Sequence, residues 1–166
     1  MKRFIFPVLV LLSFLFTSCS SEQTQHSFEI YLIKKDDKDL QKIELADKAI
    51  LTAADIKEYY WRKHQIVLTE NGLKKLPDSK EVRVSGKPFV VVVGGVRCYR
   101  GAFWTSFSSI SHPNPVINVA PIHPKKDSIV IERAYPSDSF AEGQDPRSDE
   151  LIYNVLRKLG KLKDKK

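Results

Sequence analysis

The sequence has few of the residues that mark small stapled scaffolds and metal sites. It holds only two cysteines in 166 residues, with seven glycines and nine prolines. Two cysteines are too few for a disulfide scaffold, and no C-x-x-C pair offers a zinc site. The composition, 42% hydrophobic and 28% charged, excludes collagen-like, coiled-coil and wholly disordered chains. The length allows one ordinary domain.

The N-terminal apolar run is too short for a transmembrane helix. It spans residues 4–16 after the positive Lys2-Arg3 pair, and only Pro7 and Ser13 interrupt it. Thirteen helical residues cover about 20 Å, whereas the hydrocarbon core of a bilayer is about 30 Å thick. The run therefore predicts the hydrophobic region of a signal peptide covering residues 1–18.

A lipid-attachment motif follows that run. The segment Leu15-Phe16-Thr17-Ser18-Cys19 resembles the lipobox of bacterial lipoproteins, with Phe16 where leucine is commonest. The resemblance implies that Cys19 becomes the first residue after cleavage and carries the acyl chains, palmitate among them. The alternative is an ordinary secretory signal with an incidental cysteine.

An acylated Cys19 would hold the protein at a membrane. Each buried acyl CH₂ contributes about 0.8 kcal/mol of membrane affinity. Ser20 stands where an inner-membrane retention signal would place aspartate, so the family rule implies the outer membrane in a cell that has two. Residues 19–27 are polar and predict a short tether.

Residues 28–166 predict a single α+β domain with a mostly antiparallel sheet and two or three packing helices. The first half of this domain predicts three strands and two helices. We expect strands at 28–33, 41–45 and 66–68, a helix opened by a Thr52/Asp55 capping box and ending near Arg62, and a short helix capped by Thr69 and stopped by Pro77.

The second half contains the strongest local signal, a hairpin over residues 88–99 that turns at Gly94-Gly95. Its valine run is apolar at every position, so we expect both of its faces to be covered. Residues 116–119 and 128–133 predict further strands, the first at a sheet edge or in an ordered loop because prolines flank it. Ser148 is expected to cap a final helix with an apolar stripe.

Cys98 is the only thiol left if Cys19 is acylated. A cysteine followed by His112 and His123 invites comparison with papain-like cell-wall peptidases, so a small Cys/His cell-wall hydrolase is the alternative function. Activation needs a depressed thiol pKa, and Cys98 falls within a predicted strand. We therefore favour a buried or half-buried structural cysteine. No histidine pair has metal-ligand spacing, and we expect no metal or cofactor.

The segment that follows the hairpin is aromatic and rich in hydroxyls. Phe103, Trp104 and Phe107 form a candidate interaction surface, since exposed rings beside hydroxyls suit partner binding. The alternative is that the rings fill the core and the serines mark a turn.

The C-terminal tail is basic. Residues 157–166 hold six lysines and arginines, which predict a solvated helix end or, alternatively, attraction to anionic lipid headgroups or wall polymers. No catalytic signature and no nucleic-acid module is recognisable, so we expect neither an enzyme nor nucleic-acid binding.

The order of several short segments, spread over about residues 28–135, resembles the head subdomain of the first periplasmic domain of the SecD export subunit. The segments are Ala49-Ile50-Leu51-Thr52 with Asp55-Ile56, Ile66-Val67-Leu68-Thr69-Glu70-Asn71-Gly72, residues 86–96, and Pro115-Val116-Ile117. The resemblance implies an α+β fold and a non-enzymatic role in contacting exported polypeptides. The transmembrane bundle of that family is missing, so proton-driven translocation does not carry over. The sequence therefore predicts a lipid-anchored, non-catalytic binding module of the cell envelope with an envelope or exported protein as partner.

Replacing the anchoring cysteine tests this prediction. We expect Cys19→Ser to move the protein from the membrane fraction to the soluble fraction, because the thiol that accepts the acyl chains is removed. Cell fractionation and immunoblotting measure the shift. Retention of the variant at the membrane would contradict the lipid anchor.

Overall fold

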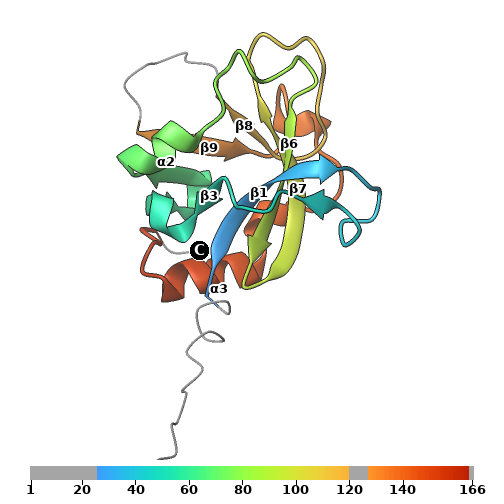
Figure 1. Ribbon diagram of the computed structural model, residues 1–166. Coiled ribbons are helices and arrows are strands. Elements are labelled where there is room, and N and C mark those ends of the chain that lie inside the picture. The colour runs from blue at the N-terminus through green and yellow to red at the C-terminus, as the bar shows by residue number, and fades with distance from the viewer. Residues whose placement is uncertain (1–25, 120–126, 165–166) are drawn as a thin grey trace, which may run out of the picture.

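The computed structural model describes residues 26–119 and 127–164, and within them nine strands form one sheet (Figure 1). The strand order is β2-β1-β6-β7-β8-β9-β5-β4, with β3 also paired to β1. The strands are β1 Phe28–Lys35, β2 Glu44–Leu45, β3 Leu51–Thr52, β4 Ile56–Tyr60, β5 Gln65–Leu68, β6 Lys87–Val93, β7 Val96–Trp104, β8 Val116–Asn118 and β9 Ser128–Glu132. Only β7 and β8 pair in parallel among these described strands.

Two α-helices accompany the sheet in the described residues, α2 Glu70–Lys75 and α3 Glu150–Lys158. This architecture confirms the predicted α+β class with a mostly antiparallel sheet. Across residues 26–119 and 127–164, no helix is long and apolar enough to cross a membrane. The predicted signal peptide and Cys19 lie outside the described residues.

The β6–β7 hairpin is the centre of the fold and confirms the hairpin prediction. Gly94 and Gly95 turn the chain with φ values of 56° and 80°, a region that glycine enters without steric cost. The register pairs Val91 with Tyr99 and Val92 with Arg97, so Cys98 is the extra residue of a β-bulge.

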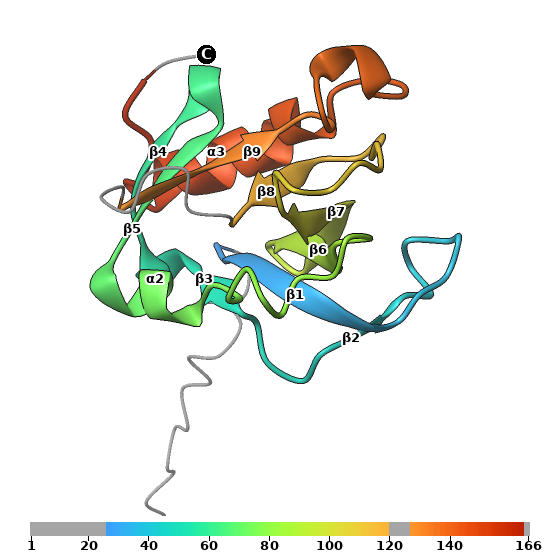
Figure 2. The same cartoon turned by 90° about the horizontal axis from the view of Figure 1, so that it is seen from above.

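Both faces of the valine run are covered, as expected. Val91 and Val93 belong to the main core together with β1, the β4–β5 hairpin and α3. Val90 and Val92 pack in a second cluster with Ile43 from the segment 36–45, which contains β2 and the turn that joins it to β1. In Figure 2 this segment stands at the right, away from α3.

One arginine fastens the 36–45 segment to the sheet. The Nη1 of Arg97 on β7 donates to the carbonyl oxygens of Leu40 at 2.8 Å, Gln41 at 2.9 Å and Ile43 at 2.8 Å. The two hydrogens of this Nη1 are shared among the three carbonyl groups, which precede the residues of β2 that pair with β1. The contact keeps Ile43 over the second valine face.

The predicted helix from Thr52 to Arg62 is wrong. The capping contact is present, since Asp55 accepts from the backbone N–H of Thr52 at 2.9 Å, but it closes only a 3₁₀ turn, η1 Ala53–Asp55. Strand β4 follows. A register shift between Ile56 and Glu58 lets Ile56 and Tyr59, three residues apart, both face the core. The bulge thus reproduces a spacing that is otherwise helical.

Two further expectations need correction. Strand β8 lies between β7 and β9 and not at an edge, because Pro113 and Pro115 precede its paired residues and leave their N–H groups free to donate. Helix α3 is capped by Asp149, whose carboxylate accepts from the N–H of Leu151, and not by Ser148. The short helix α2 with its Thr69 cap is confirmed.

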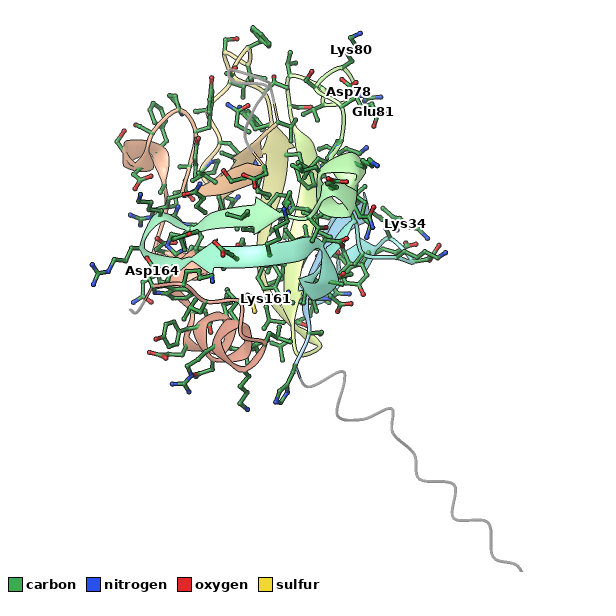
Figure 3. The ribbon with its side chains drawn as sticks, turned by 90° about the vertical axis from the view of Figure 1, so that its left-hand side faces the viewer. Lys34, Asp78, Lys80, Glu81, Lys161 and Asp164 are labelled. Atoms are coloured by element: carbon green, nitrogen blue, oxygen red, sulfur yellow. The ribbon has the colours of Figure 1, made fainter. Side chains whose placement is uncertain are left out.

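The basic tail is divided: Arg157 and Lys158 form an exposed helix end, as predicted, whereas residues 161–164 lie along the sheet edge. Leu162 bridges Tyr59 on β4, with hydrogen bonds from Tyr59 N to Lys161 O and from Lys163 N to Tyr59 O. The Asp164 carboxylate accepts from the backbone N–H groups that begin the next 3₁₀ turn, η2 Trp61–Lys63. Figure 3 shows Lys161 and Asp164 beside the β4–β5 hairpin. Covering an edge strand in this way hides its unpaired backbone groups.

We predict that the Arg97 contacts contribute measurably to the free energy of unfolding. Arg97→Met should lower the free energy of unfolding by about 2 kcal/mol, because it removes the partner of three carbonyl groups. Urea unfolding followed by circular dichroism measures the loss. Arg83→Met is the matched control, since Arg83 is exposed on the surface. An equal loss in both variants would contradict the assignment.

Candidate binding pocket

A pocket of about 270 Å³ opens beside the middle of β7. The turn at 113–115 and the loop at 141–146 form its other walls, and Leu40 closes one side. Its apolar lining residues are Leu40, Pro113, Pro115, Ala141 and Pro146; its polar lining residues are Tyr99, Arg100, Asn114, Arg133, Glu142 and Gln144. The lining is thus divided almost equally between apolar and polar residues, and its volume is near the lower end of the range for small-ligand sites.

Arg133 is the lining residue whose charge is left unmatched. Its Nη2 donates to the carbonyl oxygen of Gly143 at 2.6 Å, while its Nε is buried without a hydrogen-bond partner. No carboxylate lies within 4.0 Å of its guanidinium among the described residues. A half-buried cation without a counter-charge loses solvation and gains no ion pair in return.

The second arginine of the pocket is already neutralised. Arg100 forms an ion pair with Asp36 and donates to the carbonyl oxygen of Asp37 at 3.3 Å. Its charge therefore helps to hold the 36–45 segment, as Arg97 does. Arg133 is therefore the lining cation without a paired carboxylate, and Glu142 is the lining carboxylate.

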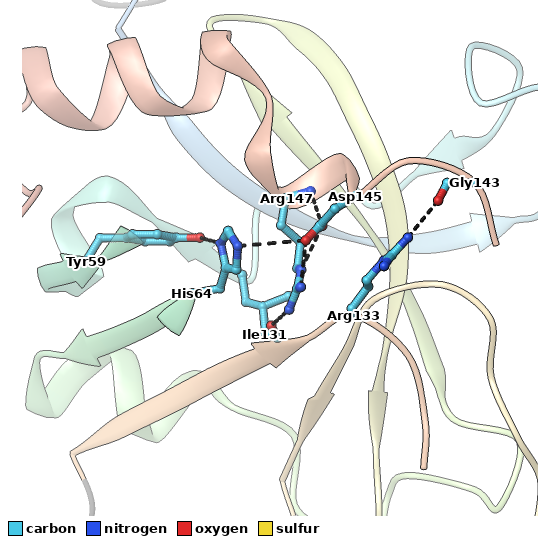
Figure 4. Close-up of polar contacts among 7 residues, drawn as sticks. All are labelled: Tyr59, His64, Ile131, Arg133, Gly143, Asp145 and Arg147. Carbon is cyan, nitrogen blue, oxygen red and sulfur yellow. Dashed lines mark hydrogen bonds and ion pairs between the residues drawn. The ribbon is translucent and has the colours of Figure 1, made fainter. Parts of the chain in front are cut away.

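The loop behind the pocket is fixed by the Asp145–Arg147 pair (Figure 4). The Nε of Arg147 donates to Asp145 Oδ1 at 2.8 Å and its Nη2 donates to Oδ2 at 2.7 Å, a bidentate arrangement. Its Nη1 donates to the carbonyl oxygen of Ile131 on β9 at 2.6 Å. Burial alone would raise the pKa of Asp145, but the hydrogen bonds from Arg147 hold that pKa below its ordinary 3.8.

His64 extends this network into the core. It occupies the left-handed region with φ of 46°, and its Nδ1 lies 3.2 Å from the hydroxyl of Tyr59. Burial, assisted by the charge of Arg147, lowers the pKa of His64 below 6.5, so the ring is neutral at pH 7. Burial also raises the pKa of Tyr59, so its phenol stays protonated, and the tautomer of the His64 ring decides which of the two groups donates. The other ring nitrogen of His64, Nε2, faces Asp145 Oδ2 at 4.0 Å.

Tyr59, His64 and Asp145 follow one another in the order of a catalytic relay. A catalytic relay also needs a nucleophile that a substrate can reach, and this one lacks it. Tyr59 is only 1% exposed and packs in the main core, so no substrate reaches its hydroxyl. A nucleophile must meet the reacting atom at hydrogen-bond distance. The network therefore supports the pocket loop and the β4–β5 hairpin.

Cys98 is half-buried and packs against the main core, as predicted. Burial, together with the charge of Asp149, raises the pKa of its thiol to about 11. This shift is opposite to the one that a cysteine nucleophile needs. His112 packs against Trp104 with ring centroids 5.0 Å apart, and His123 lies outside the described residues.

The predicted aromatic surface is reduced to one residue. Phe103 and Trp104 are 0% and 1% exposed and belong to the core, as the alternative interpretation held, because β7 runs through the middle of the sheet. Phe107 is 85% exposed on the turn that follows. These three side chains do not form one surface.

The sequence interpretation missed Arg133, Asp145 and Arg147. The local signal was Asp145-Pro146-Arg147, where an N-cap aspartate and a proline in the first turn predict a short helical turn, η4 Pro146–Ser148. Among the described residues, no group of three histidines, cysteines or carboxylates is placed to hold a metal ion.

Comparison with known proteins adds no assignment. Neither a protein-family model, nor a curated protein, nor a solved structure matches this chain. The pocket and its supporting network are therefore interpreted from their own geometry.

The buried neutral His64 predicts a pH-dependent stability. Its pKa is lower in the folded state than the ordinary 6.5, so the unfolded chain binds the proton more tightly. Stability should therefore fall as the pH drops from about 7 through that interval, with a slope of up to one proton, about 1.4 kcal/mol per pH unit. Below the folded-state pKa this slope should vanish.

Urea unfolding between pH 5 and pH 8 measures the effect. His64→Asn is the matched variant, since asparagine tolerates the left-handed backbone and does not titrate. The variant should show a flatter dependence over the same interval. Equal slopes in both proteins would show that another group is responsible.

Proposed function

We propose that this protein is a non-catalytic binding module, held at the bacterial cell envelope by acyl chains on Cys19, and that the Arg133 pocket is its ligand site. The observation that carries the proposal is the half-buried guanidinium of Arg133, which lines a pocket without a carboxylate partner. A partly buried guanidinium without a carboxylate partner is a candidate contact for an anionic ligand.

The supporting structure around the pocket agrees with a binding role. The Asp145–Arg147 pair fixes the loop that forms one wall, and Arg97 and Arg100 hold the segment that bears Leu40 on the opposite side. A site with walls held in this way loses little conformational entropy when a ligand enters. The raised pKa of the Cys98 thiol counts against the hydrolase alternative.

The envelope location rests on the sequence. The charged start, the short apolar run and the lipobox-like segment support secretion and acylation. Strand β1 begins at Phe28, nine residues after Cys19, so an extended tether would keep the domain within about 30 Å of the bilayer surface. The resemblance to the SecD head subdomain suggests that the partner is an envelope or exported polypeptide.

Site-directed photocrosslinking in intact cells tests the proposal. A photoreactive amino acid at Gln144, on the exposed rim of the pocket, should yield a discrete product with an envelope or exported protein. The same group at Lys80, an exposed residue outside the pocket, is the positional control and should yield none (Figure 3). Adding Arg133→Gln to the Gln144 probe should abolish the product, because the ligand-binding charge is lost. No product at Gln144, or an undiminished product with Arg133→Gln, would contradict the proposal.

A further inference from the structure

We infer that the Arg133 pocket recognises a single carboxylate group. The inference rests on the proposed function, in which this pocket is the ligand site, and adds the chemistry of the ligand. Arginine presents several N–H donors in a planar fork that matches the two oxygens of a carboxylate.

The orientation of Arg133 leaves one end of that fork for a ligand. Its Nη2 is held by the carbonyl oxygen of Gly143, and its Nε is enclosed by protein without a partner. Nη1, together with the second hydrogen of Nη2, is therefore the donor that we expect a ligand in the pocket to reach. The contact with Gly143 fixes the guanidinium before binding, so the ligand does not have to order it.

The guanidinium of Arg133 offers one positive charge without a paired carboxylate to a ligand in the pocket. Asp36 compensates Arg100, which leaves Arg133 as the lining cation without a paired carboxylate. Glu142, exposed on the rim, adds a solvent-screened negative charge to the lining, so a ligand with one negative charge is repelled less than a ligand with two. A phosphate dianion would bring more charge than one arginine offsets, whereas a carboxylate brings one negative charge.

The size and walls of the pocket limit what carries that carboxylate. A volume of about 270 Å³ accommodates one small residue or organic acid and not an extended ligand. Asn114 lines the pocket and can offer its side-chain amide as a further donor, while Pro113 and Pro115 present rigid apolar surface. Two sources fit this chemistry, the end or acidic side chain of a polypeptide and a free small acid.

A titration followed by ¹H–¹⁵N NMR tests the inference on the mature chain, residues 19–166, with Cys19→Ser to keep it in solution. The probes are N-acetylglycine, its amide, a pentaalanine with a free C-terminus, the same peptide amidated, and inorganic phosphate. We expect the free carboxylates to shift resonances of the 141–146 loop, and the amides to shift none. Tighter binding of pentaalanine than of N-acetylglycine assigns the peptide source, and the reverse assigns the small acid.

Variants separate recognition from loss of fold. Arg133→Gln should weaken carboxylate binding at least tenfold, and Arg133→Lys should restore it only in part, because lysine keeps the charge but not the fork. Ala141→Phe should also abolish binding by filling the pocket, and Arg83→Gln should bind as the parent does.

Equal binding of acid and amide, stronger binding of phosphate, or unchanged affinity in both Arg133→Gln and Ala141→Phe would overturn the inference. Its failure is distinguishable from failure of the proposed function. A pocket-specific crosslink without carboxylate binding leaves the binding module and removes the carboxylate. Carboxylate binding without any crosslink retains the recognition chemistry and removes the polypeptide partner.

Discussion

The bidentate pair between Asp145 and Arg147 is the contact on which the pocket depends. The chain leaves β9 and returns to α3 through a segment with little regular structure, so few ladder hydrogen bonds fix its position. Arg147 compensates by joining the Asp145 carboxylate to the carbonyl oxygen of Ile131 on β9. Both side chains are largely buried, and breaking such a pair leaves a buried charge that costs several kcal/mol.

This pair connects the core to the candidate site. On one side it meets His64 and, through His64, Tyr59 in the main core. On the other side it positions the loop whose Gly143 carbonyl orients Arg133. The three neighbouring arginines thus divide two tasks, since Arg100 and Arg147 have carboxylate partners and hold structure, while Arg133 lacks one. Arg100 and Arg147, which have carboxylate partners, stabilise the fold. Arg133, which has none, is the basis for the proposed ligand site.

The sequence predicts this fold where local chemistry decides the structure. Gly94-Gly95 forms the hairpin and Thr69 caps α2 because turn and cap geometry depend on adjacent residues. The sequence does not predict β4, since a bulge after Ile56 lets a strand carry a helical spacing. The sequence does not predict the pocket either. Arg133 differs from the neighbouring arginines only in lacking a carboxylate partner, and that depends on where the fold places all other carboxylates.

Hydrogen exchange in an Asp145→Asn variant tests the central claim most directly. The amide keeps the volume of the side chain and removes its charge, so the claim predicts faster exchange at the amides of the 138–149 segment. Protection in β6 and β7 should remain at the level of the unchanged protein, because the hairpin core does not depend on this pair. Unchanged exchange in the segment, or an equal loss of protection throughout the sheet, would contradict the claim that the Asp145–Arg147 pair holds the pocket loop.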